Sequence, residues 1–269
     1  MVDPFLIPID TGTPNDPANY FNPSSLNFWY PKIKHLDIPM PRTEIILHRK
    51  DPFAWWGFLD NEKLFQDDLK ILYDTARRIG FPLFMRNDLT SGKHNWINTC
   101  YVPDESVLQW HLYRIVEDSA LHDQLMTSII LREYIDLDSK FCAFKGFPVA
   151  PERRYFVDHG KVSCHHPYWI EAAIEFRHGS EPVEGWEDML IDMNTETDDE
   201  IALLTGYAEK IATVLKEGDW SLDFAKSKSG LWYFIDAAEA KKSWHPNGCP
   251  TCPSGQGEKK KSISVLRAE

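Results

Sequence analysis

The sequence predicts an α+β fold, because three amphipathic helical segments stand among a larger number of short strands. The helical segments span residues 62–79, 104–120 and 200–218, and their apolar residues recur at intervals of three and four. The strands are short, and two of them are joined by a tight Asp-His-Gly turn at residues 158–160. Such a turn is typical of antiparallel neighbours.

The helices are delimited by their flanking residues. Before residue 43 the chain is rich in Pro, Asn and aromatic residues, so we expect turns and extended pieces there instead of long helices. Asn61 is the expected cap of the first helix, and Gly80 is its expected end. The last helix follows an acidic segment with little periodicity, residues 179–199, and Asp198 or Asp199 is its expected cap.

Short apolar runs between turn residues predict the strands. They are expected at residues 81–86, 95–102, 128–135, 141–146, 153–157, 161–170, 220–225 and 231–238. The chain is thus expected to comprise an N-terminal segment with the first helix (1–80), an α+β domain (81–245) and a flexible tail (246–269).

Composition and charge narrow the class of protein. The formal net charge of −12 disfavours nonspecific nucleic-acid binding, because an acidic surface repels phosphate backbones. There is no apolar run of about 18 residues, and the first residues lack the pattern of a signal peptide. Five cysteines, an odd number, fit a reduced protein better than a disulfide scaffold. We therefore expect a cytoplasmic protein without a membrane span.

The first candidate site element is the stretch PLFMRNDLTSGKH, from Pro82 to His94. Backbone N–H groups in a Gly-containing turn form a concavity for anions, and Lys93 adds a positive charge suited to phosphate. By strand alternation Arg86 lies on the same face as Phe84, just before this loop. The spacing of a Walker motif is absent, and an exposed hairpin with solvated charges is the alternative interpretation.

Two further strands carry charges within apolar runs. Arg132 and Glu133 interrupt the run at residues 128–135, where unpaired buried charges would be costly. Arg153 and Arg154 enter the strand before the tight turn, and guanidinium groups on a rigid strand suit planar recognition of phosphate or carboxylate. The alternatives are a charged network in the core for the first strand and an exposed strand end for the second.

Two acids near the end of the chain complete the pattern. Asp223 and Asp236 are expected at nearly facing positions of two paired strands, each within an apolar or aromatic run. Two close carboxylates repel each other, and a divalent cation relieves that repulsion. Mg²⁺ takes few protein carboxylates and completes its shell with water and substrate phosphates. A phosphate-binding loop followed by a carboxylate pair therefore indicates a nucleotide–metal site.

In this order of elements the sequence resembles the ATP-grasp superfamily over about residues 80–245, and most of all its cell-division-cycle-type branch and small uncharacterised viral and bacterial relatives. The resemblance rests on GFPLFMR, TSGKH, ILREYI, ERRYFVDHGKV, LDFA and WYFIDAA. It implies two α+β lobes that clasp a nucleotide between them, with a hinge near residues 132–136.

The resemblance also implies residue roles. ATP would be held by the loop, the hinge and nearby cations, which are Arg86, Ser91, Gly92, Lys93, His94, Glu133, Tyr134, Ile135 and Arg153. Arg154, with Arg132 and Lys93, would act on the transferred phosphate or the acceptor. Asp223 and Asp236 would bind Mg²⁺. Where the family usually carries a further Asn this chain has Ala238, and Glu239 is the candidate replacement.

The activity that the resemblance implies is an ATP- and Mg²⁺-dependent ligase of carboxylate–amine or carboxylate–thiol type. ATP would phosphorylate a carboxylate on a small molecule, peptide or protein, and an amine would attack the resulting acylphosphate. An ATP-binding assembly factor or adaptor for a protein partner is the alternative. Modification of nucleic-acid ends is a third hypothesis, which the acidic charge disfavours.

Cysteine and histidine residues form one more candidate. Cys249 and Cys252 stand in CPTC with His245 upstream, which is half of a zinc site, since structural zinc takes four ligands. Cys164, His165 and His166 would supply the other ligands if the fold brings the segments together. The alternative is a tail that binds no metal.

Overall fold

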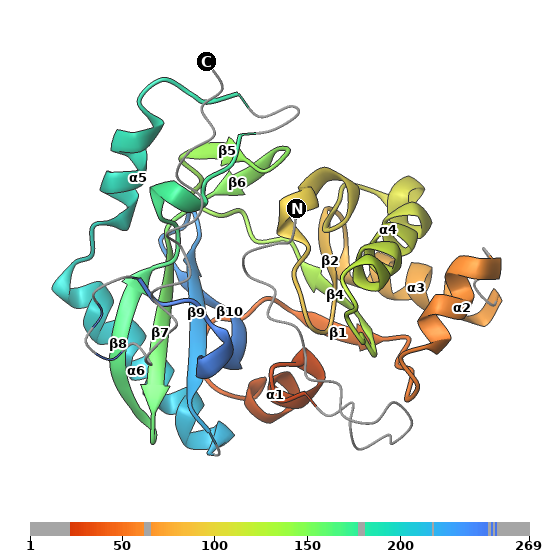
Figure 1. Cartoon of the computed structure of the whole chain (residues 1–269), viewed down its shortest axis with the longest axis horizontal. Helices are drawn as coiled ribbons and strands as arrows, with labels where there is room; N and C mark the ends of the chain where they lie inside the picture. Colours follow the sequence, from red (N-terminus) through yellow and green to blue (C-terminus); the bar gives the residue numbers. More distant parts are fainter. Residues whose placement is uncertain are drawn as a thin grey trace.

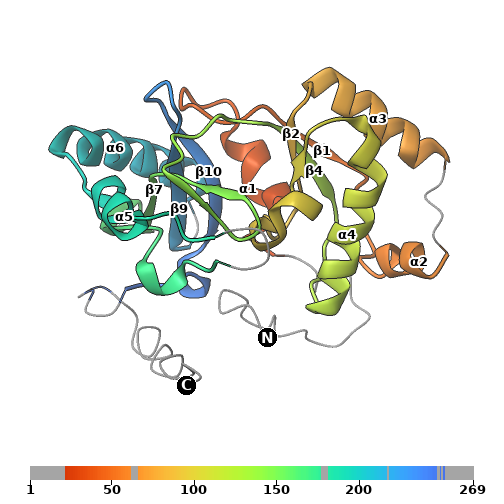
Figure 2. The same ribbon diagram turned by 90° about the horizontal axis from the view of Figure 1, so that it is seen from above.

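The computed structural model describes residues 22–61, 66–176, 181–216, 218–246, 249 and 251. Two lobes lie side by side, each built around its own four-stranded antiparallel sheet (Figures 1 and 2). Helices and sheets are mixed in both lobes, so the predicted α+β class is confirmed.

The first lobe has the strand order β1-β4-β2-β3. Its elements are β1 (Thr43–Ile46), α2 (Ala54–Asn61), α3 (Gln66–Ile79), β2 (Leu83–Asn87), β3 (Tyr101–Val102), α4 (Leu108–Leu121) and β4 (Ile129–Glu133). Leu83, Met85 and Leu131 are fully buried in one core with residues of α2, α3 and α4. Alternation along the strands turns Arg86 and Arg132 to the opposite face.

The second lobe has the strand order β10-β9-β7-β8. Its elements are β5 (Phe141–Ala143), β6 (Phe147–Val149), β7 (Glu152–Asp158), β8 (Lys161–Pro167), α5 (Trp186–Asn194), α6 (Asp198–Leu215), β9 (Trp220–Lys226) and β10 (Trp232–Glu239). Tyr155, Phe224 and Phe234 share a core with α6 and with α1 (Leu26–Ile33). The other face of this sheet carries the charged residues.

The tight turn between β7 and β8 agrees with the prediction. Asp158 and Lys161 are register partners, which leaves His159 and Gly160 as a two-residue loop. Both loop residues have positive φ, 47° and 81°, as type I′ turns require.

The chain passes from the first lobe to the second directly after β4. Leu137 forms a bridge to Ser227, and the Asp138 N–H donates to the Lys226 carbonyl at 2.9 Å. The crossing thus lies at the expected hinge. Since β1 and α3 pack in the first lobe, the division expected at residue 80 cuts through one packed unit.

Several sequence-based predictions were wrong in detail. Residues 95–102 were expected as a strand, but Lys93–Asn98 is a 3₁₀ helix and only Tyr101–Val102 is extended. The Thr99 hydroxyl donates to the carbonyls of Gly92 and Asn95, which holds the turn closed. The strand expected at 161–170 ends at Pro167.

The helix caps also differ from expectation. Thr197, and not Asp198 or Asp199, caps α6, since its side chain accepts from the Glu200 N–H at 3.2 Å. Asn61 is the last residue of α2 instead of a cap for the next helix. The helices α1, α2 and α5 were not predicted, and α1 contains Pro31, which the sequence analysis treated as a helix breaker.

A search of the described residues finds no helix with the length and apolar character needed to span a membrane.

Candidate functional site

Strand register places three of the predicted site residues in one row across the second sheet. Asp236 of β10 is opposite Asp223 of β9, and Asp223 is opposite Arg154 of β7. Register partners point to the same face of a sheet, so these three side chains are lateral neighbours. The expected facing positions of the two acids are therefore confirmed.

Arg154 and Asp223 form a bidentate ion pair. The Arg154 Nε and Nη2 atoms each lie 2.8 Å from one oxygen of Asp223. The two side chains are only 12% and 10% exposed, so the pair is largely withdrawn from water. Burial opposes the charged form of Arg154, but Asp223 outweighs it and raises the pKa of Arg154 above its ordinary value.

The first lobe supplies two arginines to the same place. The Arg86 Nη1 donates to Asp236 Oδ2 at 3.0 Å, and the Arg132 Nη1 donates to the Ile235 carbonyl at 2.7 Å. Ile235 lies in a β-bulge between Phe234 and Asp236. Both arginines are almost fully buried, and burial lowers the pKa of Arg132 to about 10. The two lobes therefore meet through charged groups at β10.

Lys93 brings the predicted loop to the same junction. Its Nζ lies 3.4 Å from Glu152 Oε1, 3.9 Å from the Tyr168 ring centroid and 4.4 Å from the Trp169 ring centroid. Burial, against the opposing effect of Lys93, raises the pKa of Glu152 to about 7, and Asp223 adds to the increase. A buried lysine among a carboxylate and aromatic rings keeps its charge at low solvation.

The backbone of the loop is fixed from within. Gly92 has φ of 64°, and a Cβ at this position would lie 3.3 Å from the Thr99 hydroxyl oxygen. The Asn87 Oδ1 accepts from the N–H groups of Leu89 and Thr90. Ser91 and Gly92 line a cavity of about 10 Å³ together with Arg86, which places the loop beside that arginine.

The expected hinge residues lie beside an aromatic group. The Tyr134 ring centroid is 5.4 Å from that of Tyr101 and 6.3 Å from that of Trp96. Glu133 ends β4, and its N–H donates to the Arg42 carbonyl at 2.9 Å. His94, at the end of the loop, packs edge-on against Phe144 at 4.8 Å. Flat rings at the hinge provide surfaces on which a planar base can stack.

Two predicted residues are not brought to this junction. Arg153 faces the other side of its strand, where its Nη2 donates to the Met193 carbonyl at 2.9 Å and its Nε lies 3.3 Å from Glu196. It lines a pocket of about 450 Å³ on that side. Glu239 forms ion pairs with Lys241 and Lys242, and alternation from Asp236 turns it to the opposite face.

The sequence analysis did not include Glu152 and Tyr168 in the site. Glu152 precedes Arg154 by two residues, so strand alternation could have indicated it once Arg154 was chosen. Tyr168 contacts Lys93 from beyond the end of β8, and its N–H donates to the Glu152 carbonyl at 2.9 Å. No local pattern signals that contact.

We call these charged residues the interlobe cluster: Arg86, Lys93, Arg132, Glu152, Arg154, Asp223 and Asp236. Four cations face three carboxylates, and the pKa of one of those carboxyls is near neutrality. The cluster is thus positive on balance, although the whole protein is acidic. Such a local excess suits a polyphosphate anion.

The two aspartates also suit a magnesium ion. Both offer carboxylate oxygens, and Asp236 is the more accessible, with 31% of its side chain exposed. Arg86 and the Ala237 N–H each occupy one Asp236 oxygen, but a carboxylate has about four lone-pair positions in all. The donor set present thus fits Mg²⁺.

A family model settles the relationship that this geometry indicates. The model, which describes an ATP-grasp domain of clade family 3, matches residues 70–253, and this range is more than half of the chain. The chain belongs to the ATP-grasp family. The predicted ATP-grasp fold, with a lobe on either side of the hinge, is thereby confirmed.

Solved structures with the ATP-grasp fold are similar at low sequence identity. Cdc123 from Schizosaccharomyces pombe has a TM-score of 0.50 and 13% identity, over 81% of this chain and 83% of that one. A RimK domain ATP-grasp protein from Sphaerobacter thermophilus has a TM-score of 0.44 and 12% identity, over 83% of this chain. This ATP-grasp chain spans 60% of the length of that protein.

A synthase is also among the similar structures. N5-carboxyaminoimidazole synthase from Aspergillus clavatus, solved with ADP and 5-aminoimidazole ribonucleotide, has a TM-score of 0.45 and 11% identity. The similarity covers 84% of this chain and 46% of that one. No curated protein sequence matches this ATP-grasp chain.

Proposed function

We propose that this protein is an ATP- and Mg²⁺-dependent ligase of the carboxylate–amine type. The observation that carries the proposal is the interlobe cluster, in which two register-paired aspartates of one lobe meet Arg86 of the other. An ATP-grasp family match over residues 70–253 supports nucleotide as the ligand.

The phosphates of ATP are assigned to cations from both lobes. Arg86 and Lys93 bind the phosphate chain, and the loop residues Ser91, Gly92 and His94 cover it. Backbone N–H groups of a glycine turn complement phosphate oxygens, as the sequence indicates. The adenine is assigned to Glu133, Tyr134 and Ile135, beside the aromatic rings at the hinge.

Asp223 and Asp236 are the proposed magnesium ligands. The bound ion would neutralise charge on the phosphate oxygens during transfer. When the two carboxylates serve as ligands, the guanidinium groups of Arg86 and Arg154 become available to phosphate oxygens. Arg132 holds the bulge at Ile235, and so it positions Asp236.

The proposed reaction has two balanced steps. A substrate carboxylate oxygen attacks the γ-phosphorus of ATP, and the bond to the bridging oxygen breaks to release ADP. An amine then attacks the acyl carbon of the acylphosphate, loses a proton and expels inorganic phosphate. Arg154 faces the transferred phosphate in this scheme. No side-chain nucleophile is needed, since positioning and charge stabilisation lower the barrier.

One observation favours a second candidate, an ATP-binding adaptor that does not ligate. The family usually carries an asparagine where this chain has Ala238, and Glu239 turns away from the two aspartates toward Lys241 and Lys242. A site with fewer metal ligands suits nucleotide binding more than it suits catalysis with two metal ions. The adaptor would then present a nucleotide-stabilised surface to a protein partner.

Release of ADP and phosphate distinguishes the two functions. Purified protein is incubated with ATP, Mg²⁺ and pooled amino acids and peptides, and both products are measured over time. A ligase gives steady, acceptor-dependent turnover. Tight binding of ATP without turnover in any pool supports the adaptor, and failure to bind ATP contradicts both candidates.

Replacing Lys93 by alanine is expected to weaken ATP far more than AMP. A hydrogen bond to a charged partner contributes about 1.5–3 kcal/mol, so the loss is on the order of 10- to 100-fold for ATP. Calorimetric titration measures both affinities. Lys145→Ala is the matched control, because Lys145 lies near the loop, 3.2 Å from Asn95 Oδ1, outside the cluster. Equal losses for ATP and AMP would remove the phosphate role of Lys93.

A further inference from the structure

Four metal-binding side chains gather beside the interlobe cluster. Cys164 and His166 come from β8, His245 and Cys249 from the C-terminal segment, and their ligand atoms all lie within 4.8 Å of one another. Cys164 and His166 are two residues apart on a strand, so they point to the same face. His166 is also the register partner of Arg154, which fixes the position of the group on the second sheet.

The distances fit a tetrahedral zinc site. Zinc bonds of about 2.3 Å to sulfur and about 2.05 Å to nitrogen place a sulfur and a nitrogen ligand about 3.6 Å apart. The Cys164 Sγ and His245 Nε2 atoms are 3.5 Å apart. Two thiols and two imidazoles are a donor set typical of structural zinc.

The surroundings of the four ligands are suited to a metal. The His166 Nε2 is buried without a hydrogen-bond partner, and Cys164 and Cys249 are free thiols. The His245 ring stacks on Phe156 at 3.5 Å, which holds the C-terminal segment on the sheet. Burial and the neighbouring His245 and His165 lower the pKa of His166 to about 4, so the imidazole is neutral, as a ligand must be.

We propose that Cys164, His166, His245 and Cys249 bind one zinc ion, which fixes the C-terminal segment to the second sheet. Four protein ligands close the coordination shell, so the role is structural. Because His166 neighbours Arg154 across the strands, the ion also supports the sheet that carries the nucleotide site. Cys252, the other cysteine of the CPTC motif, lies outside the described residues and is not a ligand in this assignment.

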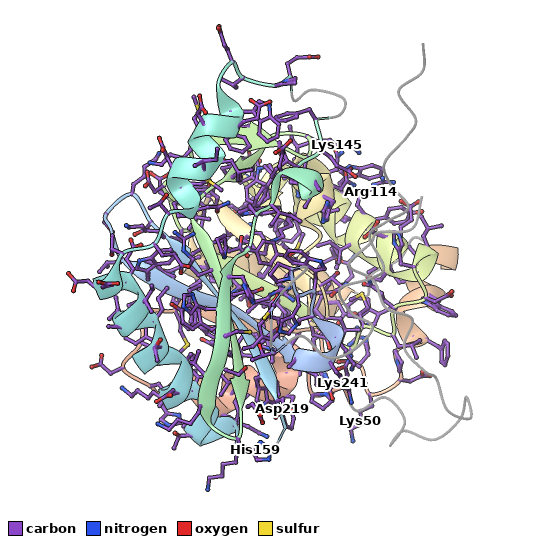
Figure 3. The ribbon with its side chains drawn as sticks, turned by 60° about the vertical axis from the view of Figure 1, so that its left-hand side comes forward. Lys50, Arg114, Lys145, His159, Asp219 and Lys241 are labelled. Carbon is purple, nitrogen blue, oxygen red and sulfur yellow. The ribbon has the colours of Figure 1, made fainter. Side chains whose placement is uncertain are left out.

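A second group of possible ligands does not support a site of this kind. Asp158, His159 and Asp219 lie at the exposed end of the β7–β8 hairpin, where Figure 3 shows His159 and Asp219 close together. All three are exposed, and nothing else at that position indicates a ligand among the described residues.

Metal content of the purified protein tests the proposal. The full chain is prepared under reducing conditions, supplied with zinc, freed of excess metal and measured by elemental mass spectrometry. We expect about one zinc ion per chain in the wild type. Cys164→Ser and Cys249→Ser each lose the ion, with affinity reduced on the order of 100-fold or more. Cys142→Ser and Cys252→Ser keep it, and Cys142 is the matched control because it is an exposed thiol on β5.

Cobalt substitution of the wild type provides a readout that does not depend on the folding of any variant. Tetrahedral Co²⁺ bound by two thiolates gives strong d–d bands and a thiolate-to-metal charge-transfer band. A zinc chelator is expected to lower the melting temperature of the wild type, since the ion binds the folded state. Asp236→Asn keeps its zinc, so this proposal and the proposed function can fail separately.

Three results would overturn the assignment. One is a wild-type chain that holds no stoichiometric zinc after supply under reducing conditions. Another is retention of the ion by Cys164→Ser. The third is loss of the ion in Cys252→Ser together with retention in Cys249→Ser.

Discussion

Replacing Asp236 by asparagine is expected to reduce Mg²⁺-dependent ATP turnover, or Mg²⁺-dependent ATP binding if there is no turnover, on the order of 100-fold. The amide removes the negative charge that pairs with Arg86 and that the proposed ion requires. Its oxygen can still accept from the Ala237 N–H, and the site is partly exposed, so the fold should be retained. Titration of ATP at several Mg²⁺ concentrations measures the effect.

The control for this change is Asp188→Asn, which alters an exposed carboxylate on α5. It removes the same charge from the chain at a place remote from the proposed metal ligands. We expect ATP binding and its Mg²⁺ dependence to remain those of the wild type. If Asp236→Asn behaves like Asp188→Asn, the metal assignment is wrong.

Replacing Arg154 by methionine is expected to destabilise the protein by about 3–5 kcal/mol, because it leaves the buried Asp223 carboxylate without its partner. The double variant Arg154→Met/Asp223→Leu should regain most of that loss, since an apolar pair replaces the charged one. Denaturant unfolding of the single and double variants measures both changes. A double variant no more stable than Arg154→Met would contradict this explanation.

A surface ion pair with the same geometry provides the comparison. Arg77 contacts the two oxygens of Glu105 at 2.7 and 2.8 Å, but both side chains are well exposed. Arg77→Met is therefore expected to change stability little, because exposed pairs are screened by water and salt. Equal losses for Arg77→Met and Arg154→Met would show that burial does not govern the effect.

Local patterns were sufficient where neighbouring strands are also neighbours in sequence. A short polar turn at residues 226–230 joins β9 and β10, so the facing positions of Asp223 and Asp236 follow from counting back along each strand. The β7–β8 hairpin follows in the same way from its Asp-His-Gly turn. Their register is fixed by a few residues of chain, which a sequence shows directly.

The direction of the arginines on β7 could not be predicted. Alternation requires Arg153 and Arg154 to face opposite sides, but the sequence does not say which side meets the first lobe. That depends on α6, which packs on the face of Tyr155 and leaves the face of Arg154 to the interlobe cluster. The ATP-binding role predicted for Arg153 stays a prediction.

Contacts between distant segments were equally hidden. His245 meets Cys164 across 81 residues, and Lys93 meets Glu152 across 59. The sequence supplied the residue types of a zinc site in two halves, but only the fold brings the halves together. The same holds for Tyr168, whose ring lies under Lys93 through tertiary contacts alone.

A crystal structure of the protein with a nonhydrolysable ATP analogue and Mn²⁺ in place of Mg²⁺ tests the central claim most directly, since Mn²⁺ is located by its anomalous signal. We predict metal density at Asp223 and Asp236, phosphates at Arg86 and Lys93, and the base beside Tyr134. Nucleotide bound instead in the pocket lined by Arg153, with no metal at the two aspartates, would contradict the account.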